Sequence, residues 1–128
     1  MTYLDTSVAL AHLLAEDRAP RATLWEESLI ASRLLEYELW VRIHARKLGR
    51  SHGDQVRALV GRLAFVELTP PALARALEPF PVPVRTLDAL HLASMEFLRA
   101  QGQVVTLASY DDRLLDAARA LKIPLYRL

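Results

Sequence analysis

Short apolar runs suited to β-strands alternate along this chain with longer segments of helical spacing, and this alternation constrains the fold most. The runs cover residues 2–5, 29–32, 65–68 and 104–107. Strands that alternate with helices favour a parallel sheet covered on both faces. The chain has about half the length of a typical closed barrel of eight strands and eight helices. We therefore predict a single domain over residues 1–128, an α/β fold built as a three-layer α/β/α sandwich around a mostly parallel sheet of four to five strands.

Helical spacing and capping residues predict where the helices begin and end. We expect helices over residues 6–14, about 21–28, 33–47, 54–63, a short one from 69, 86–101 and 111–121. Gly49 and Gly102 are expected to end two of these helices. Thr86 is expected as an N-cap after an extended connector that contains Pro79, Pro81 and Pro83. Leu125 and Tyr126 are expected to form a last edge strand.

Composition excludes several classes of protein. The chain has no cysteine, which rules out disulfides, thiolate metal sites and cysteine nucleophiles. No apolar run approaches the ~20 residues of a membrane span and no export leader is evident, so we expect a cytoplasmic protein without a membrane. The net charge of +1 is too balanced for bulk attraction to nucleic acid. Most cations are arginines, however, which suit local contacts with phosphate.

Three aspartates lie where a strand or connector passes into a helix, namely Asp5, Asp88 and Asp111. In open α/β sheets the ligand crevice lies beyond the carboxyl ends of the strands, so these side chains are expected to converge there. Aspartate at such positions also caps helices in proteins of every function. Each of these aspartates taken alone is explained as well by helix capping as by catalysis. The expected convergence of all three favours a functional site.

Glu38 is the most informative acid, because on a helix it lies in line with Leu34, Val41 and Ala45. A carboxylate inside an apolar stripe requires a cation or a metal, since burying an unpaired charge costs several kcal/mol. Arg42, at i+4, is an alternative partner that would make Glu38 purely structural.

Four converging carboxylates would repel one another, and a hard divalent cation would relieve that repulsion. Mg²⁺ or Mn²⁺ fits oxygen ligands best. The four histidines show no spacing typical of zinc sites, and no glycine-rich phosphate loop or serine-hydrolase elbow is present. His91, one turn after Asp88, is close enough in sequence to approach the site, but we assign it no catalytic role.

Four segments together resemble a known family. They are Tyr3-Leu-Asp5-Thr-Ser7, Ser32-Arg-Leu-Leu-Glu-Tyr-Glu38-Leu, Arg85-Thr-Leu-Asp88-Ala-Leu-His-Leu-Ala and Ser109-Tyr-Asp111-Asp-Arg-Leu. In this order and spacing the sequence resembles PIN-domain proteins, and specifically the VapC-type toxins of toxin–antitoxin pairs. The resemblance covers nearly the whole chain.

The resemblance implies a Mg²⁺- or Mn²⁺-dependent endoribonuclease that cuts RNA such as tRNA or rRNA and is silenced by a cognate antitoxin. It also implies a homodimer. Carried over by position, the catalytic and metal-binding acids are Asp5, Glu38, Asp88 and Asp111, with supporting hydroxyls from Thr6, Ser7 and Ser109. Asp112 is the alternative for the fourth acid.

Arg85 and Arg113 border the expected site and are candidates for contacts with RNA phosphates. Their alternative role is solvation of helix ends. Two other functions remain open: a catalytically silent scaffold of the same fold that binds RNA or protein, and a receiver-like phosphoacceptor domain. The latter would need paired acids after the first strand and a suitably placed lysine, whereas the only lysines are Lys47 and Lys122.

Overall fold

A computed structural model describes all residues of the chain, 1–128. Its elements follow in the order β1 (Thr2–Leu4), α1 (Thr6–Leu13), the 3₁₀ helix η1 (Ala22–Glu26), β2 (Leu29–Ser32), α2 (Arg33–Ala45), α3 (Gly49–Arg62), β3 (Ala64–Val66), α4 (Pro70–Ala76), α5 (Thr86–Ala100), β4 (Thr106–Ala108) and α6 (Asp112–Ala120). The alternation of strands and helices expected from the sequence is therefore confirmed.

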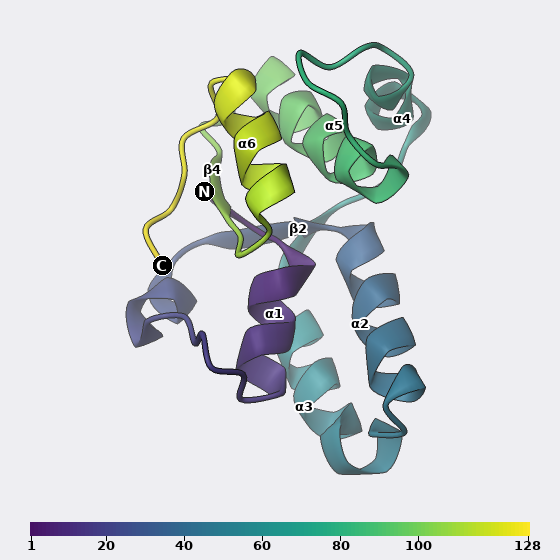
Figure 1. Cartoon of the computed structure of the whole chain (residues 1–128), viewed down its shortest axis with the longest axis vertical. Helices are drawn as coiled ribbons and strands as arrows, with labels where there is room; N and C mark the ends of the chain where they lie inside the picture. Colours follow the sequence, from purple (N-terminus) through teal and green to yellow (C-terminus); the bar gives the residue numbers. More distant parts are fainter.

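The four strands form one parallel sheet in the order β3-β2-β1-β4. In Figure 1, α1, α2 and α3 lie on one side of the sheet, and α4, α5 and α6 lie on the other. This arrangement confirms the three-layer α/β/α sandwich. The fifth strand expected at Leu125 is reduced to a single parallel bridge with Leu107.

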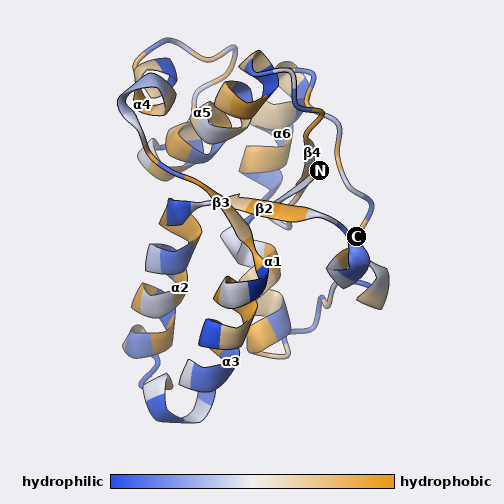
Figure 2. Cartoon of the chain, turned by 180° about the vertical axis from the view of Figure 1, so that it is seen from behind, coloured by the Kyte–Doolittle hydropathy of each residue, from blue (hydrophilic) through white to orange (hydrophobic).

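Alternation of side chains along the strands divides the core into two halves. Leu4 packs with residues of α1, α2 and α3, whereas its neighbour Tyr3 packs with residues of α5 and α6. Successive strand residues point to opposite faces, so every strand contributes to both halves. Figure 2 shows the result: β2 and β3 are coloured as hydrophobic, whereas α3 carries many hydrophilic residues on its outer surface.

The turn between α2 and α3 differs from the prediction. Helix α2 ends at Ala45, and Lys47, not Gly49, takes the left-handed conformation with φ 57°. Leu48 N–H donates to Ile43 O at 2.9 Å and Lys47 N–H to His44 O at 3.0 Å, the pair of bonds of a Schellman turn. The turn closes two residues before the glycine, so Gly49 begins α3, which starts five residues earlier than predicted.

Other boundaries shift by smaller amounts. The N-cap of α5 is Arg85, with Thr86 as the first helical residue, and β4 starts two residues later than predicted. The segment expected as a helix near residues 21–28 is a 3₁₀ turn of five residues. Gly102 ends α5 as predicted, with φ 85°. None of the helices combines the length and the apolar character needed to cross a membrane.

Candidate active site

A cleft of about 460 Å³ opens beyond the carboxyl ends of β1 and β4. All four acids predicted from the sequence line it, together with both supporting hydroxyls of α1 and both candidate arginines. Its lining consists of Asp5, Thr6, Ser7, Leu10, Glu38, Arg42, Arg85, Thr86, Leu87, Asp88, His91, Asp111 and Arg113. The expected convergence of distant acids is therefore present in the structure.

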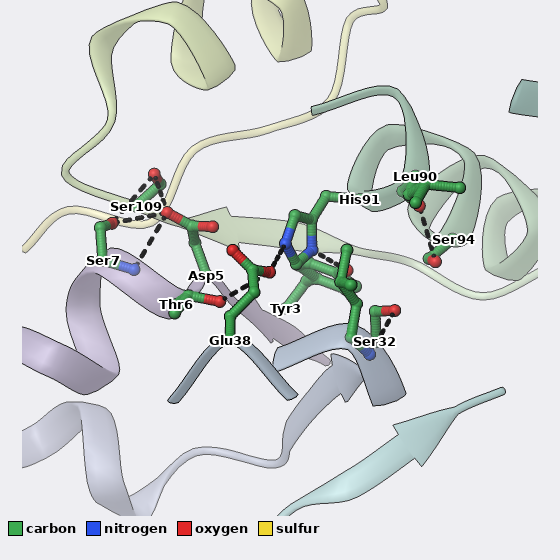
Figure 3. A network of polar contacts seen from close by, with 11 residues as sticks. Tyr3, Asp5, Thr6, Ser7, Ser32, Glu38, Leu90, His91, Ser94 and Ser109 are labelled. Atoms are coloured by element: carbon green, nitrogen blue, oxygen red, sulfur yellow. Dashed lines mark hydrogen bonds and ion pairs between the residues drawn. The ribbon is translucent and has the colours of Figure 1, made fainter. Parts of the chain in front are cut away.

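Asp5 is the most firmly held of the acids. It directly follows β1 and caps α1, and only 5% of its surface is exposed. Its Oδ2 accepts hydrogen bonds from Ser7 Oγ at 2.5 Å, Ser109 Oγ at 2.8 Å and Ser7 N–H at 3.3 Å. Figure 3 shows both serines around this one carboxylate oxygen. The two predicted serine hydroxyls thus orient Asp5 from α1 and from the segment after β4.

Glu38 reaches the cleft from α2, but not from an apolar stripe. Of the residues expected beside it, Leu34 is buried, but Val41 is 46% exposed and Ala45 is also exposed. The rest of the buried face of α2 consists of Leu35, Leu39 and Ile43. The stripe inferred from the sequence is therefore wrong, although the site assignment it supported is retained. No ion pair joins Glu38 to Arg42; its Oε1 instead accepts hydrogen bonds from Thr6 Oγ1 and His91 Nε2.

His91 contacts the site acids more closely than the sequence indicated. Its ring is buried, with Nε2 2.6 Å from Glu38 Oε1 and Nδ1 2.8 Å from the Tyr3 hydroxyl. Figure 3 shows the imidazole between these two side chains. Burial alone would lower the pKa of His91, but the hydrogen bond to Glu38 and the charges of Asp5, Glu38 and Asp88 outweigh burial and raise it. The available signal was its i+3 spacing from Asp88, which puts both residues on one helix face.

Asp88 lies in the first turn of α5 and is 8% exposed. Its Oδ2 accepts the Arg85 backbone N–H at 3.4 Å and lies 3.8 Å from Arg113 Nε. The Arg113 side chain is about half exposed, so this ion pair is weak and leaves the guanidinium accessible. Both candidate arginines therefore border the cleft, as the sequence predicted.

Asp111 both caps a helix and lines the cleft. Its Oδ1 accepts the backbone N–H groups of Arg113 at 3.0 Å and Leu114 at 3.4 Å. Asp112, the alternative fourth acid, is exposed and is not part of the lining. Capping and participation in the site are thus compatible here, because capping occupies only one of the two carboxylate oxygens.

In all four acids, protein groups bind one carboxylate oxygen and leave the other without a partner. Hydrogen bonds and ion pairs engage one oxygen of each carboxylate: Oδ2 of Asp5, Oε1 of Glu38, Oδ2 of Asp88 and Oδ1 of Asp111. The second oxygen of each has no protein partner, and none of the four is shut away from solvent, since the single buried polar side-chain atom without a partner is Thr69 Oγ1. One oxygen fixes each side chain while the other stays available to a ligand.

This donor set fits a hard divalent cation. Free carboxylate oxygens are the ligands that Mg²⁺ and Mn²⁺ prefer, and Mg²⁺ usually keeps several of its waters. No three acidic or histidine side chains approach closely enough to ligate one ion directly. Ligation by this set therefore requires bridging waters or small side-chain rotations.

Sequence comparisons agree with the geometry. The PIN domain family model matches residues 2–120. Ribonuclease VapC47 of Mycobacterium tuberculosis (strain CDC 1551 / Oshkosh) is 29% identical over 126 residues, which cover 93% of this chain and 90% of that protein. Ribonuclease VapC35 of the same strain is 30% identical over 129 residues, covering 96% of this chain and 93% of that protein.

Proposed function

The chain belongs to the PIN domain family, and from this premise we propose that it is a Mg²⁺- or Mn²⁺-dependent endoribonuclease that hydrolyses RNA phosphodiester bonds. One observation carries the proposal: acids from four separate segments line one cleft, and each presents a carboxylate oxygen that no protein group occupies. The names of the two relatives, both ribonucleases, support RNA as the substrate.

The proposed roles follow from how each side chain is held. Asp5, Glu38 and Asp88 would hold the principal metal ion, directly or through water, and Asp111 would position the attacking water or a second ion. Such an ion supplies a Lewis acid that activates water and neutralises charge on the leaving oxygen. Ser7 and Ser109 keep the Asp5 carboxylate from rotating. The guanidinium groups at the rim, Arg85 and Arg113, would bind RNA phosphates.

We further propose that this nuclease is the toxin of a type II toxin–antitoxin pair. The expected substrate is a structured RNA such as tRNA or rRNA, and the expected regulator is a cognate antitoxin. A homodimer and a cytoplasmic location complete the proposal. The similarity to VapC47 and VapC35, over nine-tenths or more of each chain, supports this assignment.

Replacement of Asp5 by asparagine tests the catalytic assignment. Asp5→Asn keeps the size of the side chain and an oxygen for Ser7 and Ser109, but removes the negative charge. We expect cleavage of total RNA to fall by about 100-fold or more, because metal stabilisation of the transition state contributes several kcal/mol. Asp112→Asn is the matched control: it removes a charge next to Asp111, outside the cleft, and should cleave like the wild type.

Mapping of cut ends with and without EDTA then separates the possible functions. Cleavage that requires Mg²⁺ or Mn²⁺ and disappears in Asp5→Asn supports the nuclease. RNA binding without cleavage in any metal would indicate the silent scaffold instead. Equal cleavage by the wild type and Asp5→Asn would refute the proposed site.

A further inference from the structure

A second cleft, of about 500 Å³, adjoins the catalytic one. Ser7, Leu10 and Arg42 line both, so the two clefts share a wall. The remaining lining comes from the end of α1 and the segment after it, residues 11–18, and from Tyr110. An extended ligand bound in the catalytic cleft can therefore continue along the surface into the second cleft.

Two side chains from distant segments form a stacked pair in this second cleft. The Arg18 guanidinium lies over the Tyr110 ring, 4.7 Å from its centre, and its Nη1 donates to Tyr110 O at 3.4 Å. Such pairs of a planar cation and an aromatic ring attract one another. They also offer the flat surfaces on which nucleic-acid bases stack.

Tyr110 is fixed relative to the catalytic acids. It stands between Ser109 and Asp111, and its backbone N–H donates to Ser7 Oγ at 2.9 Å. The same Ser7 hydroxyl donates to Asp5 Oδ2. The stacking surface and the first catalytic carboxylate are therefore held by a common side chain, so a group bound at one has a defined position relative to the other.

The charges of the second cleft suit a neutral, polar ligand. Glu16 and Asp17 are balanced by Arg18 and Arg42. A phosphate would meet the two carboxylates, and a cationic peptide side chain would meet the two arginines. A nucleobase is planar and uncharged, and its amino groups can donate to carboxylates, so it satisfies both kinds of lining residue.

We propose that the second cleft binds the base of an RNA nucleotide adjacent to the scissile bond, stacked on the Arg18–Tyr110 pair. Glu16 and Asp17 accept hydrogen bonds from the amino groups of the base, which favours guanine, adenine and cytosine over uracil. Arg42, on the shared wall, contacts the phosphate between the two clefts. The place of this base beside the scissile bond depends on the proposed function, whereas binding of a nucleotide in the cleft does not.

The experiment therefore measures nucleotide binding without catalysis. Metal-free, ¹⁵N-labelled protein is titrated with each of the four 5′-ribonucleoside monophosphates and followed by NMR. We expect shifts of the Tyr110 amide and Arg18 Nε signals, and weaker binding of the uridine nucleotide. Arg18→Ala and Tyr110→Ala should each weaken binding about 5- to 100-fold, as expected for loss of a stacking partner, whereas Tyr110→Phe should retain it.

Arg75→Ala is the matched control, since Arg75 stacks on Phe80 at 4.3 Å outside both clefts. It should leave the titration unchanged. Arg18 is exposed, so its variant keeps the test valid even if Tyr110→Ala is poorly folded. Absence of shifts at Tyr110 and Arg18, equal binding in Arg18→Ala, or shifts produced only by a basic peptide would overturn the proposal.

Cleavage assays keep this inference separable from the nuclease assignment. If nucleotides bind at Tyr110 but RNA is not cut, the result supports the base-binding site and refutes the proposed nuclease function. If RNA is cut in a metal-dependent way but nucleotides do not bind in the second cleft, the result supports the nuclease function and refutes the base-binding site. When both hold, Arg18→Ala should raise KM for RNA with little change in kcat.

Discussion

The buried hydrogen bond between Tyr3 and His91 allows a quantitative test of how the core supports the site. The Tyr3 hydroxyl and His91 Nδ1 are 2.8 Å apart, and the two residues are 0% and 3% exposed. Tyr3→Phe removes only the hydroxyl and leaves the imidazole nitrogen without this partner. His91→Leu removes the ring and leaves the hydroxyl without its partner.

Each single substitution should lower the free energy of unfolding by about 1–3 kcal/mol, the cost of leaving a buried polar group without a hydrogen bond. His91→Leu also removes the hydrogen bond from His91 Nε2 to Glu38 Oε1, so the upper half of the range is expected for it. The double variant replaces both partners of the Tyr3–His91 bond by apolar groups, and its loss of the bond to Glu38 is shared with His91→Leu. It should therefore cost about 1 kcal/mol less than the sum of the single changes.

Urea unfolding of the wild type, the two single variants and the double variant, all in EDTA, measures the coupling free energy between Tyr3 and His91. Tyr37→Phe is the control, because Tyr37 is 66% exposed and loss of its hydroxyl should change stability by less than about 0.5 kcal/mol. Additive effects of Tyr3→Phe and His91→Leu, within about 0.3 kcal/mol, would refute a stabilising Tyr3–His91 bond.

Three further predictions concern pH, turns and capping. The pKa of His91 is raised above its usual value of 6.5 in the folded protein. Its stabilising contribution is therefore full below about pH 6.5 and is lost as pH rises through the raised pKa. In EDTA, the difference in urea midpoint between the wild type and His91→Gln should shrink as pH rises over this range. Lys47→Gly should raise stability by about 0.5–1 kcal/mol by relieving a left-handed side chain, and Gly102→Ala should lower it by about 1–2 kcal/mol, as judged from urea unfolding. Asp111→Ala should lower the free energy of unfolding by about 0.5–2 kcal/mol through loss of the helix cap. Asp111→Asn should keep most of that stability and still lose RNA cleavage. Full cleavage by Asp111→Asn would show that Asp111 acts only as a helix cap.

Local chemistry made the element order and part of the site predictable. Apolar runs, proline at the start of α4 and Gly102 at the end of α5 act within a few residues, so they are visible in the sequence. Asp5 and Asp111 follow neighbouring parallel strands, whose carboxyl ends must meet at one edge of the sheet. Their convergence was therefore predictable without coordinates.

Helix ends were less predictable where no glycine marks them. The helices α1, α2 and α6 are followed by left-handed Ala15, Lys47 and Lys122, residues that carry no sequence signal for this conformation. Each turn is closed by a backbone hydrogen bond from the residue after the left-handed one to a carbonyl of the helix, from Glu16 to Ala11, Leu48 to Ile43 and Ile123 to Ala118, despite the local cost of about 1–2 kcal/mol. The boundary predicted at Gly49 was wrong for this reason.

Sequence alone indicated which carboxylates could meet, because Asp5, Asp88 and Asp111 follow a strand or connector where the chain enters a helix, and the carboxyl ends of parallel strands meet at one edge of the sheet. Tertiary structure decided what each one touches. The partner of His91 lies 88 residues away at Tyr3, and the partner of Arg18 lies 92 residues away at Tyr110. Glu38 faces the cleft because α2 buries a different side than the periodicity suggested. Contacts between distant segments depend on how whole elements pack, and no local pattern of residues encodes that packing.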